Sequence, residues 1–132
     1  MFVKKKYLTP VFIYVTLPKV IDMEKIGRQV FLYDFYGELL TEHQKSVYGD
    51  VVLNDMSLGE IAQERGISRQ GVHDLVRRCD RILASYEEKL HLVERFLRTR
   101  DDVTRIQELS ESGGPGAMQE IHRISERILE EL

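Results

Sequence analysis

The amino-acid sequence predicts an all-α fold, and three observations support this class. Apolar residues recur three and four positions apart along most of the chain, which is the spacing of an amphipathic helix. Thr41 and Ser57 are each followed three positions later by Gln or Glu, a pattern that caps helix N-termini. Only residues 11–17 have the β-branched character of a strand. The chain has 132 residues, so we expect one compact core, a small helical bundle.

The first 22 residues differ from the rest of the chain. Three lysines precede a short apolar stretch that Pro10 and Pro18 flank. This stretch superficially resembles a secretory signal, but it is much shorter than the ~20 residues of a membrane span and no small-residue cleavage site follows it. An amphipathic pattern begins at Met23, the expected natural start. We expect residues 1–22 to be an extension outside the fold, residues 23–100 to form one domain and residues 101–132 to form a helical appendage.

The first expected helix runs from Met23 to Leu40 and is apolar around much of its circumference, as in a segment packed on more than one side. Asp34 and Glu38 stand four apart on it, but without a nearby His or nucleophile we interpret them as a solvent-exposed helix edge rather than a catalytic pair. Thr41 begins the second helix, since Gln44 completes a capping box with it.

The next two helices have the layout of a helix-turn-helix. Ser57 and Glu60 form a second capping box, and Gly66 provides the left-handed backbone that ends the first of these helices. Ser68 caps the second helix, whose apolar face is formed by Val72, Leu75 and Val76. This arrangement predicts a nucleic-acid-binding module. The alternative interpretation is an ordinary helical hairpin with arginines on its exposed face.

The opposite face of the second helix carries side chains that donate hydrogen bonds to base edges and phosphates. The predicted nucleic-acid-binding residues are Ser68, Arg69, Gln70, His73 and Arg77. The whole chain has a net charge of −3, whereas residues 65–81 contain five arginines and two aspartates. Binding should therefore be local and strongly salt dependent. Two features run against the motif: Arg65 stands where an apolar residue often seals the hairpin, and Gly71 costs about 1 kcal/mol relative to Ala.

The recognition helix is expected to continue well beyond Arg81. Its apolar residues recur with coiled-coil spacing as far as Leu97. This series predicts a homodimer whose seam contains Ile82, Tyr86, Leu90, Val93 and Leu97. The same stripe could instead fold back on the first helix.

The C-terminal region should form further helices. Asp101 and Asp102 favour a helix start, the SESGGPG sequence at residues 110–116 predicts a break, and the apolar residues from 118 to 132 predict a final amphipathic helix. The polar face of this last helix is mostly acidic, which argues against binding to a membrane surface. We expect it to dock on the body of the protein or on a partner.

No enzyme signature is found in the sequence. His43, His73, His91 and His122 are scattered, so neither a metal site nor a cofactor site is expected. The only cysteine, Cys79, is interpreted as a small buried apolar residue rather than a reactive thiol. A single cysteine forms no disulfide framework within the chain, and a reducing cytoplasm is the expected compartment.

Four sequence blocks resemble the YlxM family of helix-turn-helix proteins. They are LYDFYGELLT (residues 32–41), SLGEIA (57–62), SRQGVHD (68–74) and YEEKLHLVERF (86–96), in this order. The resemblance runs from Met23 to about Phe96. Members typically have Ala and Tyr where this chain has Gly71 and His73. These two differences should affect which bases the helix contacts more than they affect the fold.

The resemblance implies a helix-turn-helix similar to region 4 of bacterial sigma factors, in a dimeric bacterial cytoplasmic protein. The family's gene commonly neighbours that of the signal recognition particle GTPase, which implies a role in that pathway. Two functions follow. The first is a DNA-binding regulator, and the second is an accessory protein that binds the particle's RNA or contacts the GTPase directly.

Overall fold

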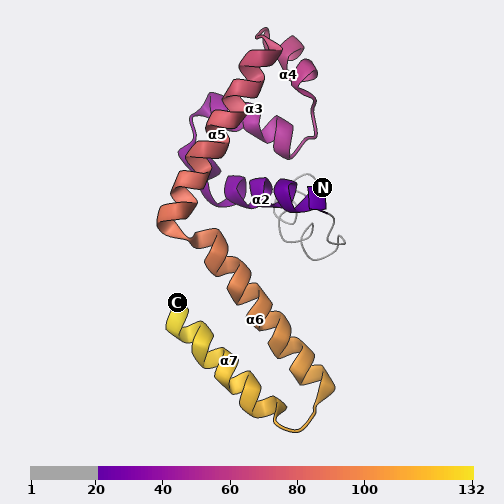
Figure 1. Cartoon of the computed structure of the whole chain (residues 1–132), viewed down its shortest axis with the longest axis vertical. Coiled ribbons are helices and arrows are strands. Elements are labelled where there is room, and N and C mark those ends of the chain that lie inside the picture. Colours follow the sequence, from indigo (N-terminus) through magenta and orange to yellow (C-terminus); the bar gives the residue numbers. More distant parts are fainter. Residues whose placement is uncertain (1–20) are drawn as a thin grey trace. The chain divides into compact units, whose positions relative to one another are not determined.

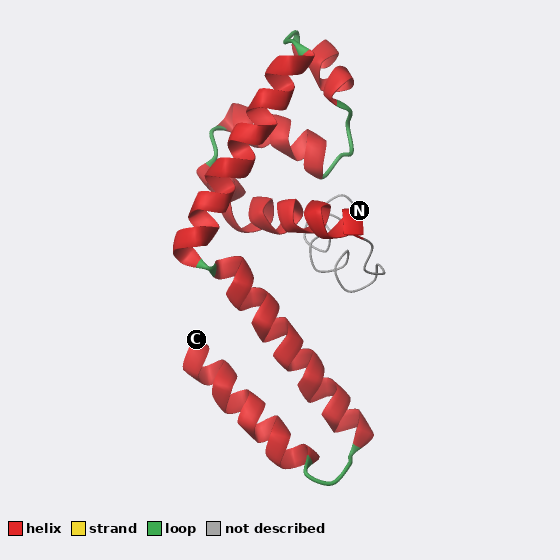
Figure 2. Cartoon of the chain, in the orientation of Figure 1, coloured by secondary structure: helices red, strands yellow, loops and turns green. Residues whose placement is uncertain are grey.

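The computed structural model describes residues 21–132, and their side chains from residue 27 onward. Within this range Figure 2 shows helices and loops only, which confirms the all-α class. None of the described helices is long and apolar enough to cross a membrane. The expectation for residues 1–22 falls outside the described residues, except that residues 21 and 22 belong to the first described helix. The helices are α2 (Ile21–Tyr36), η1 (Gly37–Leu39), α3 (Glu42–Val52), α4 (Leu58–Arg65), α5 (Arg69–Leu90), α6 (Leu92–Ser112) and α7 (Ala117–Glu131).

The chain divides into two compact units, one ending at Leu90 and one spanning His91–Leu132. We expected the division near residue 100, on the assumption that the recognition helix continues to Leu97. This assumption about the helix is wrong, because α5 ends at Leu90 and His91 has a φ of 55°, a left-handed conformation that an α-helix cannot contain. A helix start at Asp101 is also wrong, since α6 passes through this position without interruption.

In the first unit, α5 is the helix on which the others pack. Figure 1 shows α2, α3 and α4 placed along its length, and each of them contacts it. Val47, Ile61 and Val72 are fully buried where α3, α4 and α5 meet. The remaining large buried side chains include Phe31, Tyr36, Tyr48 and Leu83. The helix-turn-helix therefore belongs to the core of this unit.

A polar cluster lies within this packing. The Tyr48 hydroxyl donates a hydrogen bond to Asp80 Oδ1 over 2.6 Å, and Gln29 Nε2 donates to the same oxygen over 3.0 Å. These bonds join α2, α3 and α5. Burial and the hydrogen bond to Asp80 raise the pKa of Tyr48 well above its ordinary value of 10.0. A second tyrosine, Tyr36, donates to Glu87 Oε1 over 2.6 Å.

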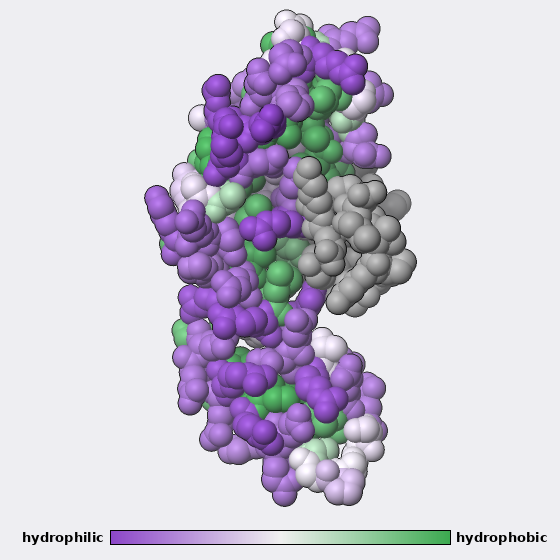
Figure 3. Space-filling view, in the orientation of Figure 1, coloured by the Kyte–Doolittle hydropathy of each residue, from purple (hydrophilic) through white to green (hydrophobic). Residues whose placement is uncertain are grey.

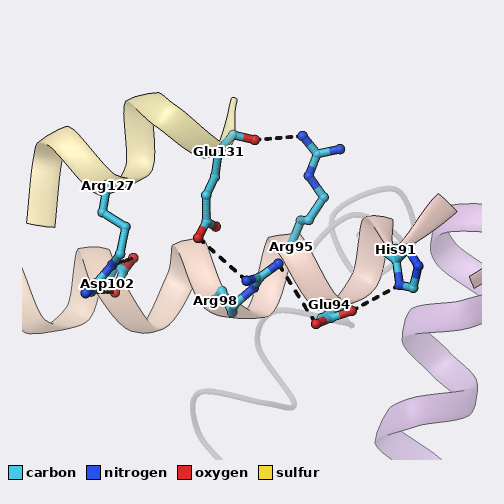
Figure 4. Close-up of polar contacts among 7 residues, drawn as sticks. All are labelled: His91, Glu94, Arg95, Arg98, Asp102, Arg127 and Glu131. Carbon is cyan, nitrogen blue, oxygen red and sulfur yellow. Dashed lines mark hydrogen bonds and ion pairs between the residues drawn. The ribbon is translucent and has the colours of Figure 1, made fainter.

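The second unit is a hairpin of α6 and α7 whose buried side chains are Val93, Leu109 and Ile124. Figure 4 shows polar contacts that also join the two helices. Arg95 Nη2 donates to the Glu131 backbone carbonyl over 2.7 Å, and Arg98 lies 3.6 Å from the Glu131 carboxylate. The turn contains Gly113 and Gly116, which have φ values of 58° and 78°. The predicted break at 110–116 is therefore confirmed, although α6 reaches residue 112.

Candidate nucleic-acid interface

The helix-turn-helix is formed by the caps that the sequence predicts. Ser57 Oγ accepts from the Glu60 backbone N–H over 3.1 Å, and Glu60 Oε2 accepts from the Ser57 N–H over 2.7 Å. Gly66 adopts φ 65° and ψ 32°, and its N–H donates to the carbonyl of Ala62. Since this conformation strains any residue with a Cβ, the glycine fixes the place where α4 ends and the chain turns toward α5.

Gly71 is explained by its contact with the cap of α5. Its N–H donates to Ser68 Oγ over 2.9 Å, and a Cβ built at Gly71 would lie 3.0 Å from the same oxygen. The glycine therefore leaves room for the capping hydroxyl, and the stability of the cap offsets part of its low helix propensity. Ser68, predicted as a nucleic-acid contact, acts in the structure as this cap.

Arg65 also fits the motif, although the sequence pattern favours an apolar residue there. Its Nη2 lies 2.5 Å from Asp50 Oδ2 and donates to Ser46 Oγ over 2.8 Å. Both partners are on α3. An ion pair with α3 thus takes the place of an apolar seal, and Arg65 is not available as a free cation for nucleic acid.

The other four predicted nucleic-acid-binding residues, Arg69, Gln70, His73 and Arg77, are all exposed on α5. The structure adds a residue that the sequence analysis did not single out. Asp74 Oδ1 accepts from Gln70 Nε2 over 2.9 Å and lies 3.7 Å from His73 Nδ1. The contact between Gln70 and Asp74 could have been predicted from the sequence, since residues four positions apart on a helix are neighbours. Basic side chains continue along α5 with the exposed Arg78 and Arg81.

The residues of the predicted dimer seam do not lie on one helix. Ile82, Tyr86 and Leu90 belong to α5, whereas Val93 and Leu97 belong to α6, because the chain breaks at His91. Tyr86 stacks on Tyr36 of the first unit with ring centroids 6.0 Å apart, and Val93 is buried in the second unit. The expectation of one continuous helix as far as Leu97 is therefore wrong, while the dimer seam itself stays a prediction.

The described residues contain no cluster of three or more His, Cys, Asp or Glu that could hold a metal ion. Cys79 is fully buried, and burial raises the pKa of its thiol to about 11, which disfavours the reactive thiolate. Asp34 and Glu38 are exposed, and Glu38 forms an ion pair with Lys45. Partial burial raises the pKa of Asp34.

Comparison with known proteins identifies the family. Residues 23–123 match the model of the UPF0122 family, described as "Putative helix-turn-helix protein, YlxM / p13 like". The chain is 44% identical over 89 residues to a UPF0122 protein of Bacillus velezensis and 43% identical over 89 residues to the UPF0122 protein YlxM of Bacillus subtilis; each match covers 67% of this chain and 81% of the relative. A UPF0122 protein of Bacillus cereus is 42% identical over 87 residues, which are 66% of this chain and 79% of the relative. The chain therefore belongs to the UPF0122 family of YlxM-like helix-turn-helix proteins.

Proposed function

We propose that this protein is a regulator that binds double-stranded DNA through the first turns of α5. The observation that carries the proposal is the group of exposed donors Arg69, Gln70, His73 and Arg77 on a capped helix whose other side is fixed in the core. A recognition helix of this kind enters the major groove with its N-terminal residues nearest the bases. The family assignment supports the same function.

The roles of the side chains follow from their chemistry. The guanidinium groups of Arg69 and Arg77 suit phosphates or guanine edges, while the amide of Gln70 suits adenine. A ring nitrogen of His73 suits a phosphate or a base edge. Because the chain as a whole is acidic, binding to arbitrary duplex should be weak at physiological salt, and a preferred sequence is needed for measurable affinity.

The test is to select duplexes from a randomised DNA pool with the full chain and to measure their affinity by fluorescence anisotropy. Arg69→Ala and Arg77→Ala should each weaken binding, and each should reduce the log–log salt slope by about 0.9 if the lost contact is to a phosphate. Arg123→Ala is the matched control, since it removes the same charge from an exposed position on α7. Equal losses in all three variants, or no selected sequence, would contradict the proposal.

A second candidate function is contact with the signal recognition particle GTPase, as the family resemblance implies. The observation that favours a protein partner is the exposed apolar surface of α7 and of the residue that follows it: Met118, Leu129 and Leu132 are 75%, 72% and 85% exposed. Figure 3 shows hydrophobic side chains reaching the surface of the second unit between hydrophilic ones. This unit carries six arginines and nine acidic residues, a balance that suits a protein better than a phosphate backbone.

This second candidate is tested by titrating the labelled full chain with the purified GTPase, and separately with the particle's RNA. We expect Leu129→Asp to weaken binding of the GTPase, while Arg69→Ala leaves it unchanged. Binding of the RNA that depends on Arg69 would favour the RNA-binding alternative instead.

We also propose that the protein is a homodimer, since exposed apolar side chains such as Leu90, at 48%, occur on a small domain. Light scattering of the full chain at micromolar concentration should give the mass of a dimer, and Leu90→Asp should lower it if this residue lies at the interface. A monomeric mass for the unmodified chain would refute the dimer.

A further inference from the structure

The outer face of the recognition helix contains one negative charge where a DNA-binding surface gains nothing from it. Asp74 is the only acidic residue between Arg69 and Arg78. Its side chain is 61% exposed, so the core does not require it. A carboxylate on a surface that approaches phosphates lowers affinity for any duplex, whatever its sequence. The contacts of Asp74 suggest what it contributes instead.

The Gln70 amide is held by this carboxylate. One N–H of Gln70 Nε2 donates to Asp74 Oδ1 over 2.9 Å, and the second N–H and the carbonyl oxygen of the amide take no part in this bond. Recognition of adenine by a glutamine needs both of these groups, the N–H for N7 and the oxygen for the N6 amino group. A free glutamine must first be ordered among several rotamers and two amide orientations, and this ordering weakens binding.

We propose that Asp74 is a specificity-determining positioning residue of the DNA interface. Its hydrogen bond presents the Gln70 amide in the orientation that reads an adenine, and its charge lowers the affinity for every duplex by repelling phosphates. This inference rests on the proposed DNA-binding function. The hydrogen bond therefore raises the preference for the matched sequence, whereas the charge leaves that preference unchanged and keeps binding to arbitrary duplex weak.

Two substitutions separate the hydrogen bond from the charge. Asp74→Asn removes the charge but keeps an acceptor oxygen for Gln70, whereas Asp74→Ala removes both. Glu88→Gln is the matched control, because Glu88 is also exposed on α5 but lies farther along the helix. Thermal unfolding of each variant checks that the fold is retained.

The experiment measures the affinity of the full chain for two probes, a duplex selected by the unmodified protein and a scrambled duplex of the same composition. Both Asp74 variants should bind the scrambled duplex about twofold to fivefold more tightly, the size of an exposed charge interaction. Asp74→Ala should also reduce the preference for the selected duplex about tenfold, as expected for a bidentate base contact, while Asp74→Asn retains most of it. Glu88→Gln should change neither quantity.

A double-mutant cycle then tests whether Asp74 acts through Gln70. Gln70→Ala should reduce the preference for the selected duplex, and adding Asp74→Ala should reduce it no further. Additive losses would overturn the positioning role, as would an unchanged preference in Asp74→Ala. If the unmodified chain selects no duplex at all, the proposed DNA-binding function fails together with this inference; if it selects one that Asp74→Ala binds with full preference, only this inference fails.

Discussion

The two units of the protein hold their helices together by different means. The eight largest fully buried side chains of the described residues all belong to the first unit, from Phe31 to Leu83. In the second unit Val93, Leu109 and Ile124 keep between 4% and 8% of their surface exposed. Ion pairs supplement this thin contact, among them Asp102 with Arg127 and Arg105 with Glu120.

The first unit therefore has the more firmly fixed geometry. Buried apolar surface contributes roughly 25 cal/mol per Å², whereas exposed ion pairs typically contribute less than about 1 kcal/mol and are weakened by salt. The recognition helix is anchored in the unit that depends on burial. The α6–α7 hairpin should therefore open locally at a lower free energy than the helix-turn-helix.

The largest effect is expected from Ile61→Ala. Ile61 is fully buried between Val47 and Val72, so its truncation should lower the free energy of unfolding of the first unit by about 2–5 kcal/mol. Urea unfolding followed by tyrosine fluorescence measures this, because no tyrosine occurs after Tyr86. Leu39→Ala, at a position that is 56% exposed, is the control and should cost less than about 0.5 kcal/mol. Equal losses would show that α4 is not packed as described.

An intermediate effect is expected at alkaline pH, again in the first unit alone. The pKa of Tyr48 is raised above 10.0 in the folded state. At a pH just above 10 the Tyr48 hydroxyl therefore stays protonated in the folded protein but loses its proton in the unfolded chain. The stability that this proton provides is complete below pH 10 and falls as the pH rises beyond it. Cys79, raised from 9.0 to about 11, acts with the same sign from pH 9 upward. The free energy of unfolding should therefore decrease between pH 9 and pH 11.

Urea midpoints across this pH range give the measurement. Tyr48→Phe and Cys79→Ala should each flatten the decrease, and a smaller fall should persist because burial also raises the pKa of Tyr33. The opening free energy measured by hydrogen exchange in α7 belongs to the second unit, so it should not decrease over the same pH range. A pH dependence that is the same in Tyr48→Phe would disprove the role of this tyrosine.

The smallest effect is expected from Arg127→Ala in the second unit. Arg127 Nε lies 3.2 Å from Asp102 Oδ2, and its Nη2 lies 2.5 Å from Oδ1. Loss of this two-point contact should lower protection of α7 from hydrogen exchange slightly, and 1 M salt should reduce the difference. Arg123→Ala, on the same helix, is the control. A larger effect that salt leaves unchanged would indicate that α7 depends on this residue for packing.

The features of the first unit that were predictable are local in sequence. The capping boxes at Thr41 and Ser57 are both present, and Gly66 has the expected left-handed backbone. Each depends on residues at most a few positions apart, so a single sequence contains the whole signal. The candidate DNA-contacting residues could be chosen for the same reason, because they share one helix face.

The features that were not predictable depend on residues distant in the sequence or on a backbone conformation that the residue type does not indicate. Asp80 meets Gln29 and Tyr48, which lie far from it in the sequence, and no spacing rule connects them. His91 breaks the chain between two apolar stretches whose spacing suits one continuous helix. A non-glycine residue with positive φ leaves no signature in hydrophobic periodicity, which is why the seam was wrongly placed on one helix.

The break at His91 has a consequence for how the chain can vary. In an uninterrupted helix, inserting or deleting one residue rotates everything beyond it by about 100°, since a turn contains 3.6 residues. Residues 92–132 lie after α5 and the left-handed residue His91, so such a rotation affects the second unit and not α5. Insertions and deletions within residues 92–132 therefore leave the orientation of Arg69 and Gln70 on the recognition helix unchanged. The C-terminal hairpin can change in length while the exposed face of α5 keeps its register.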